Sequence, residues 1–191
     1  MPWWLPTNTT YGTWLPGDPR GSVTSVRDER SGDPPSEARF EHDLPGEEYE
    51  PFIPGLYRAA AEQMRGPPIY LDLPQAELVL AQFQETAAYR GWLLRAAAIM
   101  CNHFHLVVRT PDEVDPAKVL ADFKAYASRV QNRRYGVPPS KTWWTSRGSK
   151  RKLNSDAYLA TALRYVVEKQ PSPLVVFSSE PREPEAREPE A

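Results

Sequence analysis

The chain has 191 residues, of which 40% are hydrophobic, and its formal net charge is −2. This length fits one domain of ordinary size with additional segments. The single cysteine, Cys101, excludes an intrachain disulfide and favours a reducing, cytoplasmic location. No apolar run reaches the ~18 residues that a membrane span needs, so we expect no association with a membrane.

The charges are distributed unevenly along the chain. Residues 116–154 carry ten basic residues and one acid, whereas residues 27–50 carry nine acids and three arginines. Clustered Lys and Arg release counterions from a phosphate backbone, so the basic block predicts a site for a polyanion. The alternative is an ordinary solvated helix face followed by a loop.

The hydrophobic pattern predicts alternating strands and helices. Trp, Thr and Tyr favour a strand within 3–14, which turn residues at 15–21 end. Apolar stripes at helical spacing, with Pro or Gly near their ends, predict helices over 56–64, 75–89, 116–135 and 155–169. Strands are predicted over 92–100 and 103–110 as a hairpin, at the start of the basic glycine turn within 141–152, and over 174–177.

Two histidines lie one residue apart in the predicted strand 103–110. Because side chains alternate between the faces of a strand, His103 and His105 project from the same side. That spacing lets two imidazoles share one divalent metal. An accidental pair of histidines on a strand is the alternative interpretation.

Aromatic residues accompany the cations of the basic block. Rings beside Lys and Arg suit stacked bases and phosphates, although Trp143 and Trp144 are equally suited to a core. The predicted nucleic-acid-binding residues are Lys124, Arg129, Arg133, Lys141, Trp144, Arg147, Lys150, Arg151 and Lys152.

Four motifs, in this order, resemble those of the single-tyrosine HUH transposases, the insertion sequence 200-like and REP-associated tyrosine transposases. They are residues 11–18, Asn102–His105, residues 143–152 and residues 163–170. The resemblance implies an α+β fold, a ferredoxin-like or RRM-like sandwich with a central antiparallel sheet and helices packed on it. It also implies a homodimer acting on single-stranded DNA that contains a hairpin.

The same resemblance implies a chemistry for named residues. His103, His105 and Gln170 would hold Mg²⁺ or Mn²⁺, and Tyr165 would attack the scissile phosphate to form a 5′-phosphotyrosine intermediate. The DNA strand would thus be cut and rejoined by a metal-dependent transposase. Tyr126 is the rival nucleophile, and Tyr158 is a neighbour of Tyr165 on the same predicted helix face.

The position of Gln170 departs from the family pattern. It lies five residues after Tyr165 instead of four, so an unbroken helix would rotate it about 140° away from Tyr165. A single π-turn would bring the two residues together. Otherwise, the third ligand is another residue and Lys169 is available to a phosphate.

The expected organisation follows from these assignments. Residues 1–24 form the first strand and turn of the catalytic domain, 25–55 an acidic proline-rich insertion, 56–177 the remainder of the domain, and 178–191 a disordered acidic tail. Two other functions stay open: a domesticated nucleic-acid-binding module that does not cleave, and a hydrolytic metal phosphoesterase.

Overall fold

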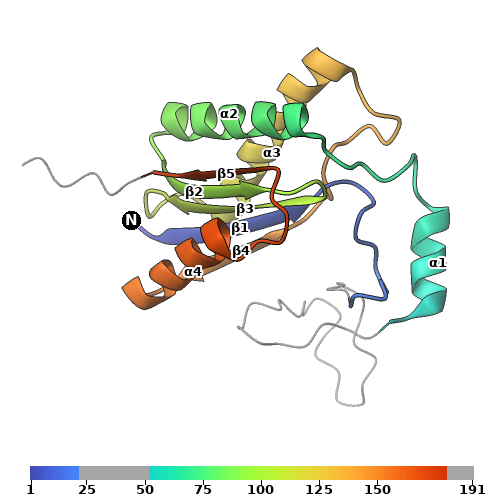
Figure 1. Ribbon diagram of the computed structural model, residues 1–191, viewed down its shortest axis with the longest axis horizontal. Helices are drawn as coiled ribbons and strands as arrows, with labels where there is room; N and C mark the ends of the chain where they lie inside the picture. The colour runs from blue at the N-terminus through green and yellow to red at the C-terminus, as the bar shows by residue number, and fades with distance from the viewer. Residues whose placement is uncertain (22–51, 180–191) are drawn as a thin grey trace, which may run out of the picture.

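The computed structural model describes residues 1–21 and 52–179. Most of the predicted acidic insertion and nearly all of the predicted tail therefore lie outside the described residues. The described residues form one antiparallel sheet with helices on both of its faces (Figure 1).

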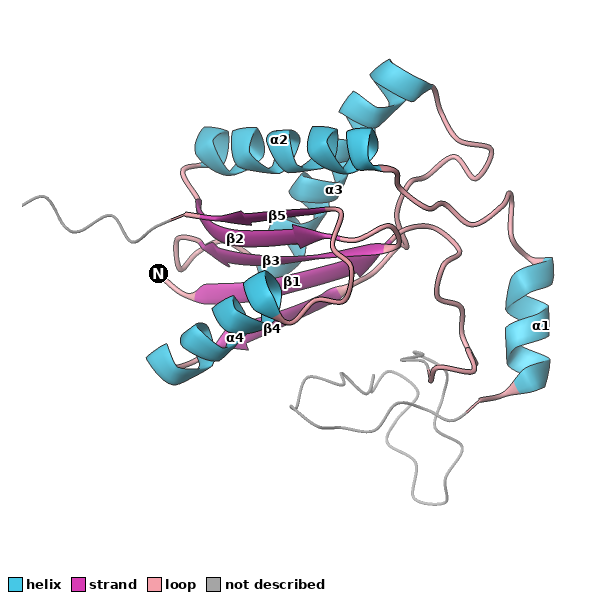
Figure 2. Cartoon of the chain, in the orientation of Figure 1, coloured by secondary structure: helices cyan, strands magenta, loops and turns pink. Residues whose placement is uncertain are grey.

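Five strands form the sheet in the order β4-β1-β3-β2-β5 (Figure 2). Every neighbouring pair is antiparallel. The succession β1, α2, β2, β3, α3, β4 is the ferredoxin-like arrangement, to which α4 and β5 are added. The predicted α+β fold is confirmed. The strands are β1 (Trp3–Thr9), β2 (Leu93–Ile99), β3 (His103–Arg109), β4 (Ser149–Leu153) and β5 (Val175–Ser178).

The helices divide between the two faces of the sheet. On one face, α2 (Leu73–Arg90) and α3 (Pro116–Tyr135) bury the larger core, which includes Phe104 and Leu106 of β3. On the other face α4 (Asp156–Glu168) packs through Ala162 and Val166 against Val107. The remaining helix, α1 (Pro54–Glu62), stands beside the sheet in Figure 1. None of the described helices is long and apolar enough to cross a membrane.

Local signals in the sequence explain where the helices begin and end. The Asp72 carboxylate accepts from the Gln75 N–H, and the Gln75 side chain accepts from the Asp72 N–H, which makes a capping box at the start of α2. Gly91, at φ 68°, ends the helix in the left-handed conformation. Asp115 caps α3, whose bounds agree with the predicted 116–135.

Two predicted strands are shorter than expected. The first ends at Thr9, beyond which the chain turns and Gly12 adopts φ 72°. The strand expected to start near residue 141 begins only at Ser149. The reason is that Trp143 and Trp144 enter the core: Trp143 Nε1 donates to Asn132 Oδ1 at 2.8 Å, and the Trp144 ring lies 5.3 Å from that of Phe104.

Candidate active site

The two histidines of β3 lie on the face of the sheet that α4 covers. Their ring centroids are 5.0 Å apart. Val107, the next residue on the same face, packs into the core under α4, whereas Phe104 and Leu106 point into the opposite core. The two-residue period of the strand therefore brings His103 and His105 together, as the sequence indicates.

Tyr165 of α4 lies directly beside this pair. Its ring centroid is 5.1 Å from that of His105, and the two planes meet at 73°. Val166, the neighbouring residue, is fully buried and holds the helix on the sheet. Tyr165 nevertheless remains 42% exposed, so its phenol is accessible from solvent while its ring contacts the imidazole.

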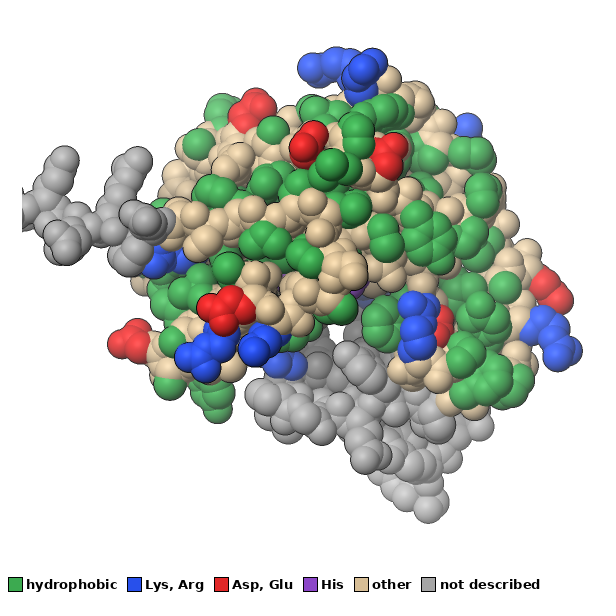
Figure 3. Space-filling model, viewed as in Figure 1, with side chains coloured by type: hydrophobic (Ala, Val, Ile, Leu, Met, Phe, Trp, Pro, Cys, Tyr) green, Lys and Arg blue, Asp and Glu red, His purple; other side chains and the backbone are tan. Residues whose placement is uncertain are grey.

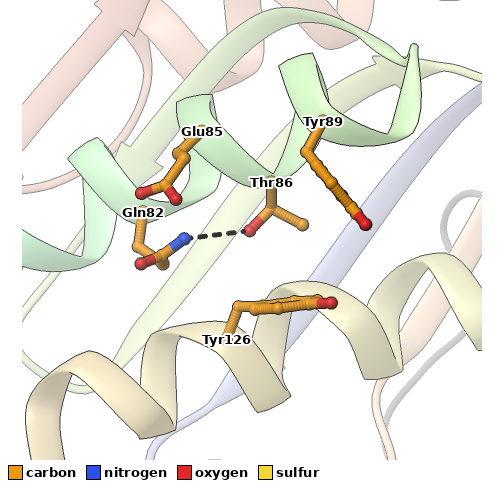
Figure 4. A pocket seen from close by; sticks show the side chains of 5 residues that line it. All are labelled: Gln82, Glu85, Thr86, Tyr89 and Tyr126. Carbon is orange, nitrogen blue, oxygen red and sulfur yellow. Dashed lines mark hydrogen bonds between the residues drawn. The ribbon is translucent and has the colours of Figure 1, made fainter.

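Tyr126, the rival nucleophile, lies on the other side of the sheet. It belongs to α3 and lines a pocket of about 260 Å³ between α2 and α3, with Glu85 and Tyr89 among its neighbours (Figure 4). The guanidinium of Arg129 lies 4.8 Å from the Tyr126 ring. Because the sheet separates α3 from α4, Tyr165 rather than Tyr126 is the tyrosine that contacts the histidine pair.

Gln170 reaches the site because α4 ends before it. The helix stops at Glu168, and Lys169 adopts φ −108° and ψ 2°, with its N–H donating to the Tyr165 carbonyl oxygen at 3.3 Å. Gln170 Nε2 donates to the same oxygen at 3.0 Å, and the Gln170 side chain also lies close enough to His103 to raise the pKa of that ring. The five-residue spacing thus requires neither a continuing helix nor a π-turn.

Each imidazole is held by a polar side chain through its Nδ1 atom. A hydrogen bond of 2.6 Å joins His103 Nδ1 to Asn102 Oδ1, and one of 2.7 Å joins His105 Nδ1 to Thr7 Oγ1. Sequence reasoning assigned no role to either partner. Asn102 was recognisable as the residue before the pair, but Thr7 lies opposite His105 only because β1 pairs with β3 in this register.

Burial keeps both imidazoles neutral. His105 is 8% exposed, and burial, with a smaller effect of the neighbouring His103, lowers its pKa to about 3. Burial also lowers the pKa of His103, while the hydrogen bond with Gln170 opposes that shift. In Figure 3 histidine is visible only as a small purple area near the centre of this view. Neutral imidazole is the form that binds a metal.

The donors at the site fit a divalent cation. Both Nδ1 atoms are engaged, which leaves the Nε2 atoms of His103 and His105 and the amide of Gln170. Within the described residues no cluster of three His, Cys, Asp or Glu side chains could hold a metal, and the Gln170 amide is the further protein donor beside the two imidazoles. Two imidazoles are an unusual set for a cation as hard as Mg²⁺.

The basic residues of β4 do not form one surface. Arg151 is paired with Leu5, whose side chain packs in the core under α4, so it lies on the face of the histidines. Lys150 and Lys152 alternate with it and lie on the opposite face, where Lys152 Nζ is 6.0 Å from the Trp4 ring. The strand therefore splits the predicted basic patch between two faces.

Two residues predicted to contact nucleic acid instead make contacts within the protein. Trp144 is 2% exposed and offers no ring face to a base. Lys124 donates to the backbone oxygens of Thr145 and Arg147, and burial, with a smaller effect of Lys150, lowers its pKa to about 8. The other predicted contacts that are exposed to solvent are Arg129, Arg133, Lys141, Arg147 and Lys152.

Comparisons with known proteins identify a family for the chain. A family model described as "Transposase IS200 like" matches residues 71–169, which is 99 of the 191 residues. This range includes His103, His105 and Tyr165 and ends one residue before Gln170. No curated protein matches the chain.

The chain is also similar to a solved structure described as "Structure of the REP associates tyrosine transposase bound to a REP hairpin". The two are 10% identical, with a TM-score of 0.46. The similarity covers 86% of this chain and 64% of that one, so the chain spans a little under two thirds of the length of the solved protein.

Proposed function

Because the chain belongs to the IS200-like transposase family, we propose that it cuts and rejoins single-stranded DNA through a covalent bond to Tyr165. The observation that carries this proposal is the placement of Tyr165 against His105, with His103 and Gln170 beside it. The proposed nucleophile and the three proposed metal ligands thus lie together beside one face of the sheet.

The proposed reaction is a transesterification. The Tyr165 oxygen attacks the scissile phosphorus, the bond from phosphorus to the 3′-oxygen breaks, and the phenol proton is released as the 3′-oxygen gains one. The products are a 5′-phosphotyrosine and a free 3′-hydroxyl. A second 3′-hydroxyl reverses the step and joins a new strand, and no nucleotide cofactor is needed because the phosphodiester bond energy is retained.

His103, His105 and Gln170 are the residues that would hold Mg²⁺ or Mn²⁺. Bound there, the cation would polarise the scissile phosphate and stabilise the charge of the transition state. Burial lowers the pKa of both histidines, so each ring is neutral at neutral pH and one of its two nitrogens carries no proton. The partly exposed Tyr165 lets a DNA strand approach from solvent.

We propose Arg151 as the contact from β4 to the DNA backbone near the nucleophile, since it shares the face of the histidines. Arg129, Arg133, Lys141 and Arg147 stay proposed contacts for more distant phosphates. Trp144 is excluded by its burial. We further propose, from the family resemblance, that the DNA contains a hairpin and that the protein acts as a homodimer.

The test is a gel assay for covalent adducts. Labelled single-stranded hairpin oligonucleotides from the regions that flank the gene are incubated with the full chain and Mg²⁺ or Mn²⁺. Tyr165→Phe and the double variant His103→Ala/His105→Ala are expected to abolish the adduct. Tyr126→Phe is the matched control, because the sheet separates this tyrosine from the site, and it is expected to retain the adduct.

The alternative functions give different results in the same assay. Cleavage without an adduct would indicate a hydrolytic metal phosphoesterase. Metal-independent binding without cleavage would indicate a nucleic-acid-binding module. An adduct that persists in Tyr165→Phe would contradict the assignment of the nucleophile.

A further inference from the structure

The short turn between β2 and β3 carries Asn102 directly before the histidine pair. We propose that Asn102 is a positioning residue that keeps the single proton of the neutral His103 ring on Nδ1 and thereby leaves Nε2 bare. The consequence for metal binding rests on the proposed function, whereas the position of the ring proton is independent of that function.

The hydrogen bond itself fixes the direction of donation. The Asn102 Oδ1 atom has no proton to give, so His103 Nδ1 must donate across the 2.6 Å that separate them. A neutral imidazole has only one N–H. With that proton on Nδ1, Nε2 carries a lone pair.

Gln170 competes with Asn102 for this proton. Its Nε2 donates one N–H to the Tyr165 carbonyl oxygen, and we assign the amide oxygen to the side that faces the His103 ring because this contact raises the pKa of His103. An acceptor at that position raises the pKa of His103, as the contact with Gln170 does. Without Asn102, the ring proton would move to Nε2 and be donated to Gln170, and both ligand atoms would then be blocked.

The backbone of Asn102 is held by several hydrogen bonds. Its carbonyl oxygen accepts from the Thr10 N–H at 2.8 Å, and the hydroxyls of Thr10 and Thr13 lie 3.1 and 3.2 Å from the same atom. Both threonines are buried. On the other side of the turn, the Cys101 carbonyl oxygen accepts from the Leu71 N–H at 2.7 Å. These hydrogen bonds fix the backbone of the turn, from which the Asn102 side chain reaches His103 Nδ1.

This anchoring gives a role to part of the first sequence motif. Thr13 belongs to residues 11–18, a segment that supplies none of the proposed catalytic side chains. Through the Asn102 carbonyl oxygen, Thr13 and the preceding Thr10 connect the end of β1 to the residue before His103. The motif thus acts on the site through the turn.

The experiment measures the protonation of the histidine ring nitrogens directly, by ¹⁵N NMR of the full, metal-free chain at neutral pH. The variant His103→Gln identifies the signals of this ring. The test variant is Asn102→Ala, which removes the acceptor oxygen. Asn102→Asp is the conservative variant, because it retains an acceptor oxygen at the same position. Asn132→Ala is the matched control, since Asn132 Oδ1 also accepts one side-chain N–H, that of Trp143, away from the site.

We expect His103 to carry its proton on Nδ1 in the wild type, in Asn102→Asp and in Asn132→Ala, and on Nε2 in Asn102→Ala. Calorimetric titration with Mn²⁺ is expected to show about 10- to 100-fold weaker binding by Asn102→Ala, and no loss in Asn132→Ala. A proton on Nε2 in the wild type, or on Nδ1 in a folded Asn102→Ala, would overturn the proposal.

The readouts separate this inference from the proposed function. A wild type that binds no Mn²⁺ and forms no DNA adduct, but whose ring proton moves as described, would refute the function and leave the role of Asn102 intact. If Asn102→Ala does not fold, the wild-type and Asn102→Asp spectra still test the proposal. A proton on Nε2 with none on Nδ1, in either protein, would contradict the role of the acceptor. Unchanged Mn²⁺ affinity in a folded Asn102→Ala would refute the link to the metal.

Discussion

A methyl group added at Gly148 should destabilise the fold, because this glycine is tightly enclosed. It precedes β4 in the basic turn. A Cβ atom at this position would lie 2.5 Å from Asn8 Nδ2, 2.6 Å from the Thr7 carbonyl oxygen and 2.7 Å from Leu120 Cδ2. All three distances are shorter than a carbon atom tolerates, so Gly148→Ala must displace its neighbours.

The neighbours differ in how readily they move. The end of the Leu120 side chain can rotate, but the Thr7 oxygen is backbone in β1, which is paired on both sides. Asn8 is 2% exposed, and its Nδ2 donates to the Arg147 carbonyl oxygen. Overpacking of this kind costs about 1–3 kcal/mol, and the fixed Thr7 oxygen places Gly148→Ala in the upper half of that range.

Urea denaturation followed by circular dichroism measures this cost. In a protein of this length, about 2–3 kcal/mol corresponds to a fall in Tm of about 4–12 °C. Gly55→Ala is the matched control, because a Cβ atom there has no neighbour within 4 Å and the residue lies in α1. We expect it to be neutral or stabilising by up to about 1 kcal/mol. A Gly148→Ala protein within about 0.5 kcal/mol of the wild type would refute the packing described for this turn.

Three further predictions concern pH, DNA and a helix cap. The unfolded chain protonates His105 below its ordinary pKa of 6.5, whereas the folded chain does so only near about 3, so stability should fall as the pH drops through this window. The loss should reach about 2 kcal/mol near about pH 5, and urea titrations should show a smaller loss in His105→Gln. Arg151→Gln should reduce the salt dependence of single-stranded DNA binding by about 0.7 in the log–log slope, measured by fluorescence anisotropy. Lys152→Gln, on the opposite face, should reduce it less, and equal effects would contradict the division of the basic block. Asp72→Ala should cost about 1 kcal/mol in chemical denaturation through loss of the α2 capping box, whereas Asp112→Ala, at an exposed ion pair, should stay within about 0.5 kcal/mol of the wild type.

The error in the predicted strand near residue 141 has a physical cause. Trp and Thr residues, as in Thr142–Thr145, favour a strand wherever they occur. At Trp143 and Trp144, however, burying two large rings against Phe104 and α3 outweighs that preference, and the chain reaches β4 only at Ser149. Such an outcome depends on the space left between distant elements, which local patterns do not contain.

Local periodicity alone determined the features with short-range causes. The two-residue period of a strand places His103 and His105 on one face, and capping residues with an apolar stripe bound α3 at Pro116–Tyr135. The tertiary structure decided what surrounds the pair. Thr7 meets His105 through strand register, and Gln170 returns to His103 because α4 ends at Glu168. Neighbours along the chain set periodicity and capping, whereas register, helix ends and the division of charge between faces depend on contacts between residues far apart in sequence.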